Sequence, residues 1–365
     1  MLRVGIVGLP NVGKSSLFNA LTSAAAPSEN YPFCTVDPNV GTVLVPDPRL
    51  DVVHRLAESK AKVPTVVQFV DIAGLVEGAS EGEGLGNRFL ANIREVDAIA
   101  HVLRCFEDPD VVHVSGSVDP VRDREIVETE LALADLEVVE RRLEKQEKKA
   151  KSGEKEAIRE VAALRKVLVP LCEGKPARKA DLTEEERQVL RPYPLLTLKP
   201  VLYVANVGEG DLPGGTNRYT DAVASSIQDE GDAEMVTVCS AMEAELAQLD
   251  EDHVGEFLAE LGLQERGLNR LIRGAYDLLG LITFFTTGEK ESRAWTVARG
   301  SRAPQAAGAI HSDFERGFIR AETIGHEAFS AAGSWKVARD RGLLRSEGKE
   351  YLVQDADIML FRFNV

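Results

Sequence analysis

The sequence contains few cysteines and no long apolar segment. Its 365 residues include four cysteines, which lie far apart and form no CxxC pair. Scattered cysteines of this kind are typical of reduced thiols in a reducing compartment. No run of about 18 apolar residues occurs, so we expect no membrane span. Because the N-terminal run also lacks the basic region and cleavage site of a signal peptide, we expect a cytoplasmic protein.

An excess of positive charge is also missing. The chain has 43 Lys and Arg against 59 Asp and Glu, a net charge of −16. Such a chain repels a phosphate backbone, so an RNA contact would need a local basic patch. The six histidines show no metal-ligand spacing, and we therefore expect no zinc site. The length indicates two or three domains, and we expect a monomer.

Alternating strand and helix patterns predict an α/β fold. Several of the strand candidates are continuous apolar runs, which is typical of parallel strands buried on both faces of a sheet. The helical pattern "KSSLFNALTSA" follows the first of them directly. The candidates are residues 2–8, 67–74, 98–106, 199–206 and 233–241.

Residues 121–196 have a different texture, dense in Glu and Lys with few helix breakers. Apolar residues recur at helical spacing, with Leu131, Leu133, Leu136, Val139 and Leu143 before the segment "KSGEK" and Leu164, Val167 and Leu168 after it. This pattern predicts two long antiparallel helices joined at Ser152–Gly153. A capping-box spacing, Thr183 to Glu186, predicts a short helix further on.

The tip of this helical arm has two interpretations. It carries five lysines, which could contact an anion, but charge runs are more often solvated faces. The lysines are Lys145, Lys148, Lys149, Lys151 and Lys155. A further change of texture after about residue 276 predicts a small C-terminal α/β module. The expected domains are therefore a discontinuous first domain (1–120 plus 197–277), the arm (121–196) and the module (278–365).

The stretch "GLPNVGKSS" at 8–16 fits the P-loop pattern GxxxxGK[ST] between a predicted strand and a predicted helix. Its glycines allow successive backbone N–H groups to point at phosphate oxygens, and the helix N-terminus adds partial positive charge. The lysine is predicted to reach the β- and γ-phosphates, and the serine hydroxyl after it to ligate Mg²⁺. The candidate nucleotide-binding residues here are Asn11, Val12, Gly13, Lys14, Ser15 and Ser16.

Two further segments distinguish among P-loop enzymes. "DIAG" (71–74) ends a hydrophobic strand, so that Asp71 could hold Mg²⁺ through water and the Gly74 N–H could sense a γ-phosphate. "NYPFCTVDPNVG" places Thr35 in a loop, where its hydroxyl could complete the Mg²⁺ shell. With the P-loop these residues form a GTPase-type switch constellation, which a nucleotide kinase does not need. The predicted metal ligands are Ser15, Thr35 and Asp71.

The residue after Gly74 departs from the Ras-like pattern. It is Leu75 instead of a glutamine that orients the attacking water, so hydrolysis must be slow or use another group. The candidates are backbone groups, a cation, or His113 in the predicted loop "DVVHVSG". The alternative for His113 is a loop histidine held by local hydrogen bonds. The candidate catalytic residues are Lys14, Gly74 and His113.

The segment that reads the base also departs from the usual pattern. Asn206-Val207-Gly208-Glu209 stands where guanine-specific enzymes have Asn-Lys-x-Asp. The Glu209 carboxylate should lie about 1.5 Å beyond the aspartate position, roughly one C–C bond. Misplaced hydrogen-bonding partners lower discrimination, so we expect adenine to be tolerated or preferred, with Asn206 accepting from its N6 amine. The remaining base-side candidates are Val207, Ser240, Ala241 and Met242.

These segments resemble the YchF family of Obg-related P-loop NTPases over nearly the whole chain. The resemblance includes "GLPNVGKSSLFNALT", the "NVGE" replacement, the helical insertion and "IHSDFERGFIRAETI" at 310–324. It implies a Ras-like G domain interrupted by a coiled-coil arm and followed by a ubiquitin-like β-grasp (TGS) domain. It also implies a preference for ATP over GTP and association with the ribosome. Asn11 resembles an asparagine that ligates K⁺ in related GTPases, which makes K⁺ a candidate cofactor.

Three functions remain open at this point. The first is a slow, Mg²⁺-dependent ATPase that releases ADP and phosphate. The second is a nucleotide-gated binding module with negligible turnover, in which bound triphosphate orders the loops around Thr35 and Gly74. The third is a conventional GTPase with degenerate motifs.

Overall fold

The computed structural model describes residues 2–23, 39–72, 85–228, 230 and 233–364. The chain forms two compact units, an N-terminal unit (Met1–Val43 and Gln68–Leu271) and a C-terminal unit (Leu44–Val67 and Ile272–Val365). The expected three-domain division stays a prediction; it differs from these units at 44–67 and 272–277, and the arm at 121–196 lies within the N-terminal unit. The segment 44–67 packs with the C-terminal unit because its strand β3 (Ala61–Val63) pairs with β9 (Glu291–Ala298).

A six-stranded sheet forms the centre of the N-terminal unit, in the order β2-β4-β1-β5-β6-β7. The pairs from β4 through β7 are all parallel. Every residue of β5 and β6 is buried, which confirms the prediction from their continuous apolar runs. The strands are β1 (Arg3–Val7), β2 (Val40–Leu44), β4 (Val66–Asp71), β5 (Ala98–Cys105), β6 (Val201–Val207) and β7 (Glu234–Val238). The helices that accompany them are α1 (Lys14–Ser23), α3 (Leu85–Arg94), α7 (Arg218–Ile227), α8 (Ser240–Leu246), α9 (Glu251–Glu260) and α10 (Gly267–Leu278).

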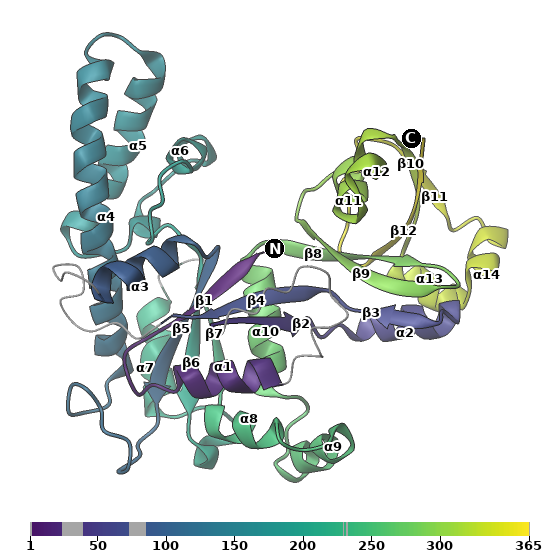
Figure 1. The fold of residues 1–365 in the computed structure, drawn as a ribbon, viewed down its shortest axis with the longest axis horizontal. Helices are drawn as coiled ribbons and strands as arrows, with labels where there is room; N and C mark the ends of the chain where they lie inside the picture. Colours follow the sequence, from purple (N-terminus) through teal and green to yellow (C-terminus); the bar gives the residue numbers. More distant parts are fainter. Residues whose placement is uncertain (1, 24–38, 73–84, 229, 231–232, 365) are drawn as a thin grey trace. The chain divides into compact units, whose positions relative to one another are not determined.

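The predicted helical hairpin is present. Helices α4 (Pro120–Ala150) and α5 (Lys155–Cys172) lie side by side and reverse at residues 151–154 (Figure 1). The predicted capping box at Thr183 opens α6 (Glu184–Leu190). The prediction that Leu133 belongs to the apolar face of the first arm helix is wrong, because Leu133 is 41 % exposed and lies outside the arm's core. A helix turns by about 200° over two residues, so Leu133 cannot share a face with the buried Leu131.

The base of the arm is fixed by buried polar groups. Tyr203 of β6 donates its hydroxyl to Glu128 of α4 at 2.7 Å, and Arg178 bonds to the same carboxylate. Arg124 of α4 pairs with Glu230 at 3.2 Å. Breaking one partner of such a buried pair is strongly destabilising, since the other charge stays buried. The first turns of α4 are therefore held tightly against the sheet.

The C-terminal unit contains a second, mixed sheet in the order β11-β10-β12-β8-β9-β3. Its two faces each pack on a core, one built around Phe284 and Phe361 and the other around Phe285 and Ile358. The second core also takes Leu50 of α2 (Pro48–Ala57). The other elements are β8 (Leu281–Thr287), β10 (Phe318–Gly325), β11 (Arg345–Glu347), β12 (Asp357–Phe363), α11 (Ala303–Ile310), α12 (Ser312–Arg316), α13 (His326–Ala332) and α14 (Trp335–Asp340).

Two absences hold for the described part of the chain. None of its helices is both long enough and apolar enough to cross a membrane. The three cysteines that it includes, Cys105, Cys172 and Cys239, are unpaired.

Replacing Asp135 with alanine should destabilise the N-terminal unit. The Asp135 carboxylate is buried on α4 and accepts hydrogen bonds from the backbone N–H groups of Leu196 and Thr197, each at 2.8 Å, and from the Thr197 hydroxyl. Losing a charged acceptor from buried donors should lower the free energy of unfolding by about 3 kcal/mol. Urea unfolding of the full chain, followed by circular dichroism, measures the change. The control is Glu137→Ala on the same helix, whose side chain is 71 % exposed and which should change stability by no more than about 0.5 kcal/mol. Equal effects of the two substitutions would contradict the anchoring role of Asp135.

Candidate functional site

The predicted site residues gather where the parallel strands end. Strand β1 runs into the P-loop at Gly8, and its residue Ile6 lies in register with Asp71 at the end of β4. Asn206 lies near the end of β6, in register with Arg104 of β5. The carboxyl ends of parallel strands share one edge of a sheet, the usual ligand-binding edge of such folds. The topology therefore brings together segments far apart in the sequence.

The P-loop backbone requires its glycines. Gly13 has φ +97°, and a Cβ there would lie 2.3 Å from the Asn206 side-chain nitrogen. A Cβ on Gly8 would lie 2.5 Å from the Val102 carbonyl oxygen. Asn11 takes φ +62°, a left-handed conformation that asparagine tolerates better than most residues. The loop is thus both tightly turned and tightly packed, as phosphate-binding loops require.

Lys14 places a buried positive charge at this loop. Its ammonium group donates to the Leu9 carbonyl oxygen at 2.7 Å, and the residue is 8 % exposed. Burial lowers the pKa of Lys14 to about 8, opposed by the attraction of Asp71. Within the described ranges no carboxylate forms an ion pair with it. A buried ammonium beside a helix N-terminus fits a phosphate group.

Asp71 and Ser15 are next to each other, as the switch constellation predicts. Burial raises the pKa of Asp71, while the Lys14 charge and a hydrogen bond from the Ser15 side chain lower it. Hydroxyl and carboxylate oxygens are the ligands that Mg²⁺ prefers, so this donor pair fits the ion. The other members of the constellation, Thr35, Gly74 and the neighbouring Leu75, lie outside the described residues.

Asn206 links the P-loop to the base-side loop. Its amide nitrogen donates to the Val12 carbonyl at 2.9 Å, and its carbonyl oxygen accepts from the Ser240 N–H at 3.0 Å. The Asn206 carbonyl oxygen accepts one hydrogen bond and has a second lone pair, so the expectation that it accepts a hydrogen bond from the adenine N6 amine stays a prediction. An amide nitrogen has two N–H groups, so one remains as a donor. A ring nitrogen such as N7, common to adenine and guanine, suits that donor.

The other base-side candidates divide by exposure. Val207 and Met242 are buried at 2 % and 4 % exposure, so their side chains pack in the core. Val207 therefore does not cover a base in the way that the lysine of the guanine motif does. Glu209 and Ala241 are exposed at the starts of the 3₁₀ turn η3 (Glu209–Asp211) and of α8. Glu209 is thus the candidate of this set with a charged group free to meet a base.

His113 is held by protein groups at both ring nitrogens. Its Nε2 lies 2.8 Å from the Asp123 carboxylate in the first turn of α4, and its Nδ1 accepts from the Ser115 N–H at 3.1 Å. Both side chains of the His113–Asp123 pair are at most 4 % exposed. The conformation seen here matches the alternative interpretation, a loop histidine fixed by local hydrogen bonds. A catalytic His113 would first have to leave Asp123.

The sequence did not point to Arg104, nor to the contact that the predicted site residue Asn11 makes with this loop. Arg104 is 2 % exposed and donates to the carbonyl oxygens of Phe106, Asp108 and Val111. Asn11 ties the P-loop to the same segment through the carbonyl of Val112 at 3.0 Å. An arginine inside the apolar strand "AIAHVLRCF" is an available signal, since buried charge needs partners, whereas the Asn11 contact depends on the fold alone.

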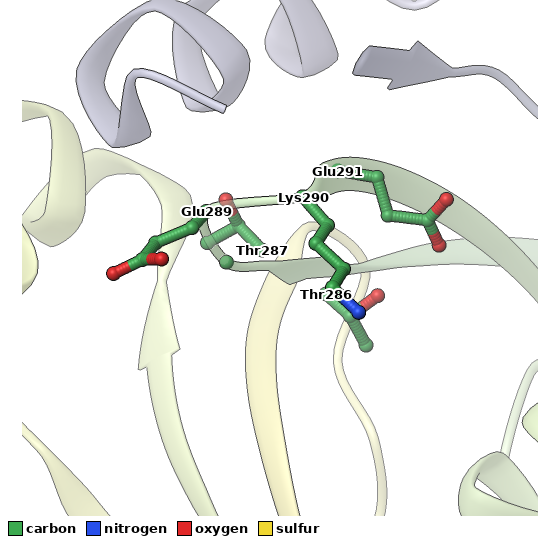
Figure 2. Close-up of a pocket in the computed structure, with 6 residues that line it drawn as sticks. Thr286, Thr287, Glu289, Lys290 and Glu291 are labelled. Carbon is green, nitrogen blue, oxygen red and sulfur yellow. The ribbon is translucent and has the colours of Figure 1, made fainter. Parts of the chain in front are cut away.

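A separate hollow in the C-terminal unit lacks the features of a ligand site. It lies at the β8–β9 hairpin and is lined by Thr286, Thr287, Gly288, Glu289, Lys290 and Glu291. Figure 2 shows that the side chains of Glu289, Lys290 and Glu291 point away from one another. Ligand sites place a few polar groups that converge on one space, so the P-loop edge remains the candidate site.

Comparisons with known proteins found relatives that match the whole chain. A family model described as a 50S ribosome-binding GTPase matches residues 3–132, and the model YchF-GTPase_C, described as a protein of unknown function (DUF933), matches 281–364. The chain is 53 % identical to the ribosome-binding ATPase YchF of Haemophilus influenzae and 52 % identical to that of Bacillus subtilis, covering all of this chain and at least 99 % of each relative. A solved structure of the Schizosaccharomyces pombe YchF GTPase is 37 % identical, with a TM-score of 0.88 over 99 % of this chain and 97 % of that one. The predicted fold class, a P-loop α/β domain with a helical insertion and a further C-terminal domain, is confirmed.

Gly13→Ala should strongly weaken nucleotide binding. The added methyl group would clash with the Asn206 amide, and the positive φ is unfavourable for alanine. Titration with a fluorescent nucleotide should show at least about a hundredfold loss of affinity, roughly 3 kcal/mol. The matched control is Gly116→Ala, since Gly116 has φ +78° but no atom within 4 Å of an added Cβ. A binding loss shared equally by both variants would point to backbone strain alone and contradict the packing argument.

Proposed function

The chain belongs to the YchF family of ribosome-binding ATPases, and from this we propose that it is a P-loop ATPase that hydrolyses ATP to ADP and phosphate and binds the ribosome as a slow, nucleotide-dependent switch. The observation that carries the proposal is the buried ammonium of Lys14 at the head of α1, which forms no ion pair with a carboxylate of the described residues and lies near Asp71 and Ser15. These groups suit a bound triphosphate and little else.

In this proposal the P-loop supplies binding and charge. Backbone N–H groups of residues 11–16 and the Lys14 ammonium hold the phosphate tail. Lys14 exchanges its bond to the Leu9 carbonyl for phosphate oxygens, and their charge favours its protonated form. Mg²⁺ bound at Ser15, Thr35 and Asp71 would neutralise charge that develops on the transferred phosphoryl group. Catalysis then rests on positioning and electrostatic stabilisation, as in other phosphoryl-transfer enzymes.

The base side supports ATP as the preferred nucleotide. Glu209 takes the place of the aspartate that chelates guanine, with a carboxylate about one C–C bond further out. The remaining Asn206 N–H suits a ring nitrogen that both purines have, and the second lone pair of its carbonyl oxygen suits the adenine N6 amine. Two of the relatives carry the name ATPase and the solved relative is called a GTPase, so the choice of nucleotide deserves a direct measurement.

Turnover in this proposal depends on His113. The histidine is hydrogen-bonded to Asp123, and hydrolysis requires it to leave this partner and approach the attacking water. The same pairing favours the second candidate function, a nucleotide-gated module with negligible turnover. In that case the occupied P-loop would act through Asn11 on the Val112 segment, to which it is directly bonded.

Three finer features complete the proposal. The protein works in the cytoplasm and acts as a monomer. The Asn11 amide nitrogen is bonded to Val112, which leaves its carbonyl oxygen to ligate a cation such as K⁺. Comparing turnover in K⁺ and Na⁺ buffers tests the last feature.

Glu209→Asp should shift the nucleotide preference toward GTP. Shortening the side chain brings the carboxylate back to the position that accepts two hydrogen bonds from guanine. The ratio of GTP to ATP affinity should rise about tenfold, roughly 1.4 kcal/mol. Competition titration against a fluorescent ATP analogue measures both affinities. The control is Glu234→Asp, because Glu234 is exposed. Asp211→Ala would be unsuitable, because Asp211 bonds to the Gly208 N–H and to Asn217. A wild-type protein that prefers GTP would overturn the ATPase assignment.

His113→Ala should lower kcat about a hundredfold and leave the dissociation constant of ATP within about twofold. The effect falls on kcat because, within the described residues, the His113 ring bonds to Asp123 and Ser115 and not to the P-loop. The control is His253→Ala, an exposed histidine on α9. Unchanged turnover in His113→Ala would remove the catalytic role. If the wild-type protein itself turns over no ATP while binding it tightly, the gated-module function is the correct one.

A further inference from the structure

Three arginines meet one carboxylate on an open face of the C-terminal sheet. Arg320 of β10 and Arg362 of β12 each lie 3.5 Å from Glu322, and Arg339 of α14 lies 3.8 Å from it. Their side chains are 51 %, 50 % and 64 % exposed, whereas that of Glu322 is 16 % exposed. We call these residues the arginine face. Its three arginines and one glutamate give it a net charge of +2.

Stability of the fold does not account for the arginine face. Arg320 and Arg362 occupy directly opposite positions on neighbouring antiparallel strands. Like charges in that arrangement are destabilising. Exposed ion pairs contribute little, and these distances exceed those of ordinary hydrogen bonds. The guanidinium groups are therefore concentrated at some cost and remain available to another anion.

The same side of the sheet is covered further along the strands. Ile324 and Ile358 belong to a core that includes Phe329 of α13. Arg320 and Arg362 follow the same strand alternation but are exposed. On this side of β10 and β12 the side chains change from buried isoleucine to exposed arginine. The arginine face is therefore open to solvent and borders the packed core.

The charge of the whole chain makes this surface exceptional. The protein carries a net charge of −16, yet residues 281–364 contain 12 Lys and Arg against 11 Asp and Glu. The tip of the arm is a weaker candidate, because residues 144–156 set five lysines among four glutamates and Lys148 is already paired with Glu144. A polyanion approaching this acidic protein is repelled unless it meets a local cationic patch.

We propose that the arginine face binds the phosphate backbone of RNA. Guanidinium groups form paired hydrogen bonds with phosphate oxygens, and they do so more readily than ammonium groups because they are planar and weakly hydrated. The inference rests on the proposed ribosome binding, for which it names the contact, the phosphates of ribosomal RNA. It does not depend on the nucleotide that the P-loop selects.

The first experiment uses the full chain and a fluorescein-labelled uridine homopolymer. Arg320→Ala/Arg362→Ala removes two of the three arginines and leaves Arg339 to pair with Glu322. Fluorescence anisotropy at moderate salt should show RNA binding weakened about tenfold. The slope of log affinity against log salt should fall by about 1.4, since each phosphate contact with a single strand contributes about 0.7.

Two matched variants control for charge and folding. Arg302→Ala/Arg316→Ala makes the same change in net charge within the same unit, but each of these arginines has its own carboxylate, Glu350 and Asp313. This variant should bind RNA like the wild type. Arg320→Lys/Arg362→Lys keeps the charge and should retain the salt slope, which a damaged fold would not. Equal RNA binding by the two alanine variants would overturn the proposal.

The second experiment pellets purified ribosomes with each variant in ATP. If the wild-type protein does not pellet, the proposed ribosome binding fails. If the wild-type protein and Arg320→Ala/Arg362→Ala pellet equally, ribosome binding stands and the arginine face is wrong. Loss of pelleting with unchanged homopolymer binding would assign the surface to a ribosomal protein and overturn the RNA contact. Loss of both, with ATP turnover unchanged, is the expected result.

Discussion

A single buried ammonium group determines how the site must be built. Lys14 lies where water is largely excluded, and burial, opposed in part by the attraction of Asp71, brings its pKa down to about 8. Keeping a charge there requires close polar contacts, and the chain supplies the Leu9 carbonyl and the nearby Asp71 carboxylate. The charge is unpaired by any described carboxylate, so the site is incomplete until an anion binds. The glycines, the parallel strands and the helix N-terminus all serve to hold this group in place.

The groups around the cradle connect it to the rest of the N-terminal unit. Asn206 bonds both to the P-loop and to the loop that begins α8, so the phosphate and base ends of the site are fixed relative to each other. Asn11 and Arg104 organise the segment that carries His113, and Asp123 anchors that histidine to the first turn of the arm. A change in the P-loop can therefore reach the base of the arm through a short series of direct contacts.

The sequence was sufficient to predict features that depend on residues close together in the chain. Continuous apolar runs predicted buried parallel strands, and the glycine and lysine spacing predicted the cradle, because both patterns depend on neighbouring residues. Features that depend on contacts between distant segments were missed or misread. Asn206 was expected only at the base, but it also bonds to the Val12 carbonyl and the Ser240 N–H. The pairing of β3 with β9 and the three carbonyl partners of Arg104 likewise arise only in the folded chain. The roles of Thr35 and Gly74 lie outside the described residues and stay predictions.

The central claim is that the P-loop amides and Lys14 bind a triphosphate, and that the base contributes less. Calorimetric titration of the full chain with ATP and with adenosine, both in Mg²⁺, tests it most directly. The account predicts that ATP binds at least about a thousandfold more tightly, roughly 4 kcal/mol in favour of the phosphates. Affinities that differ by less than about tenfold would contradict it, because the binding energy would then come from the nucleoside and not from the buried charge.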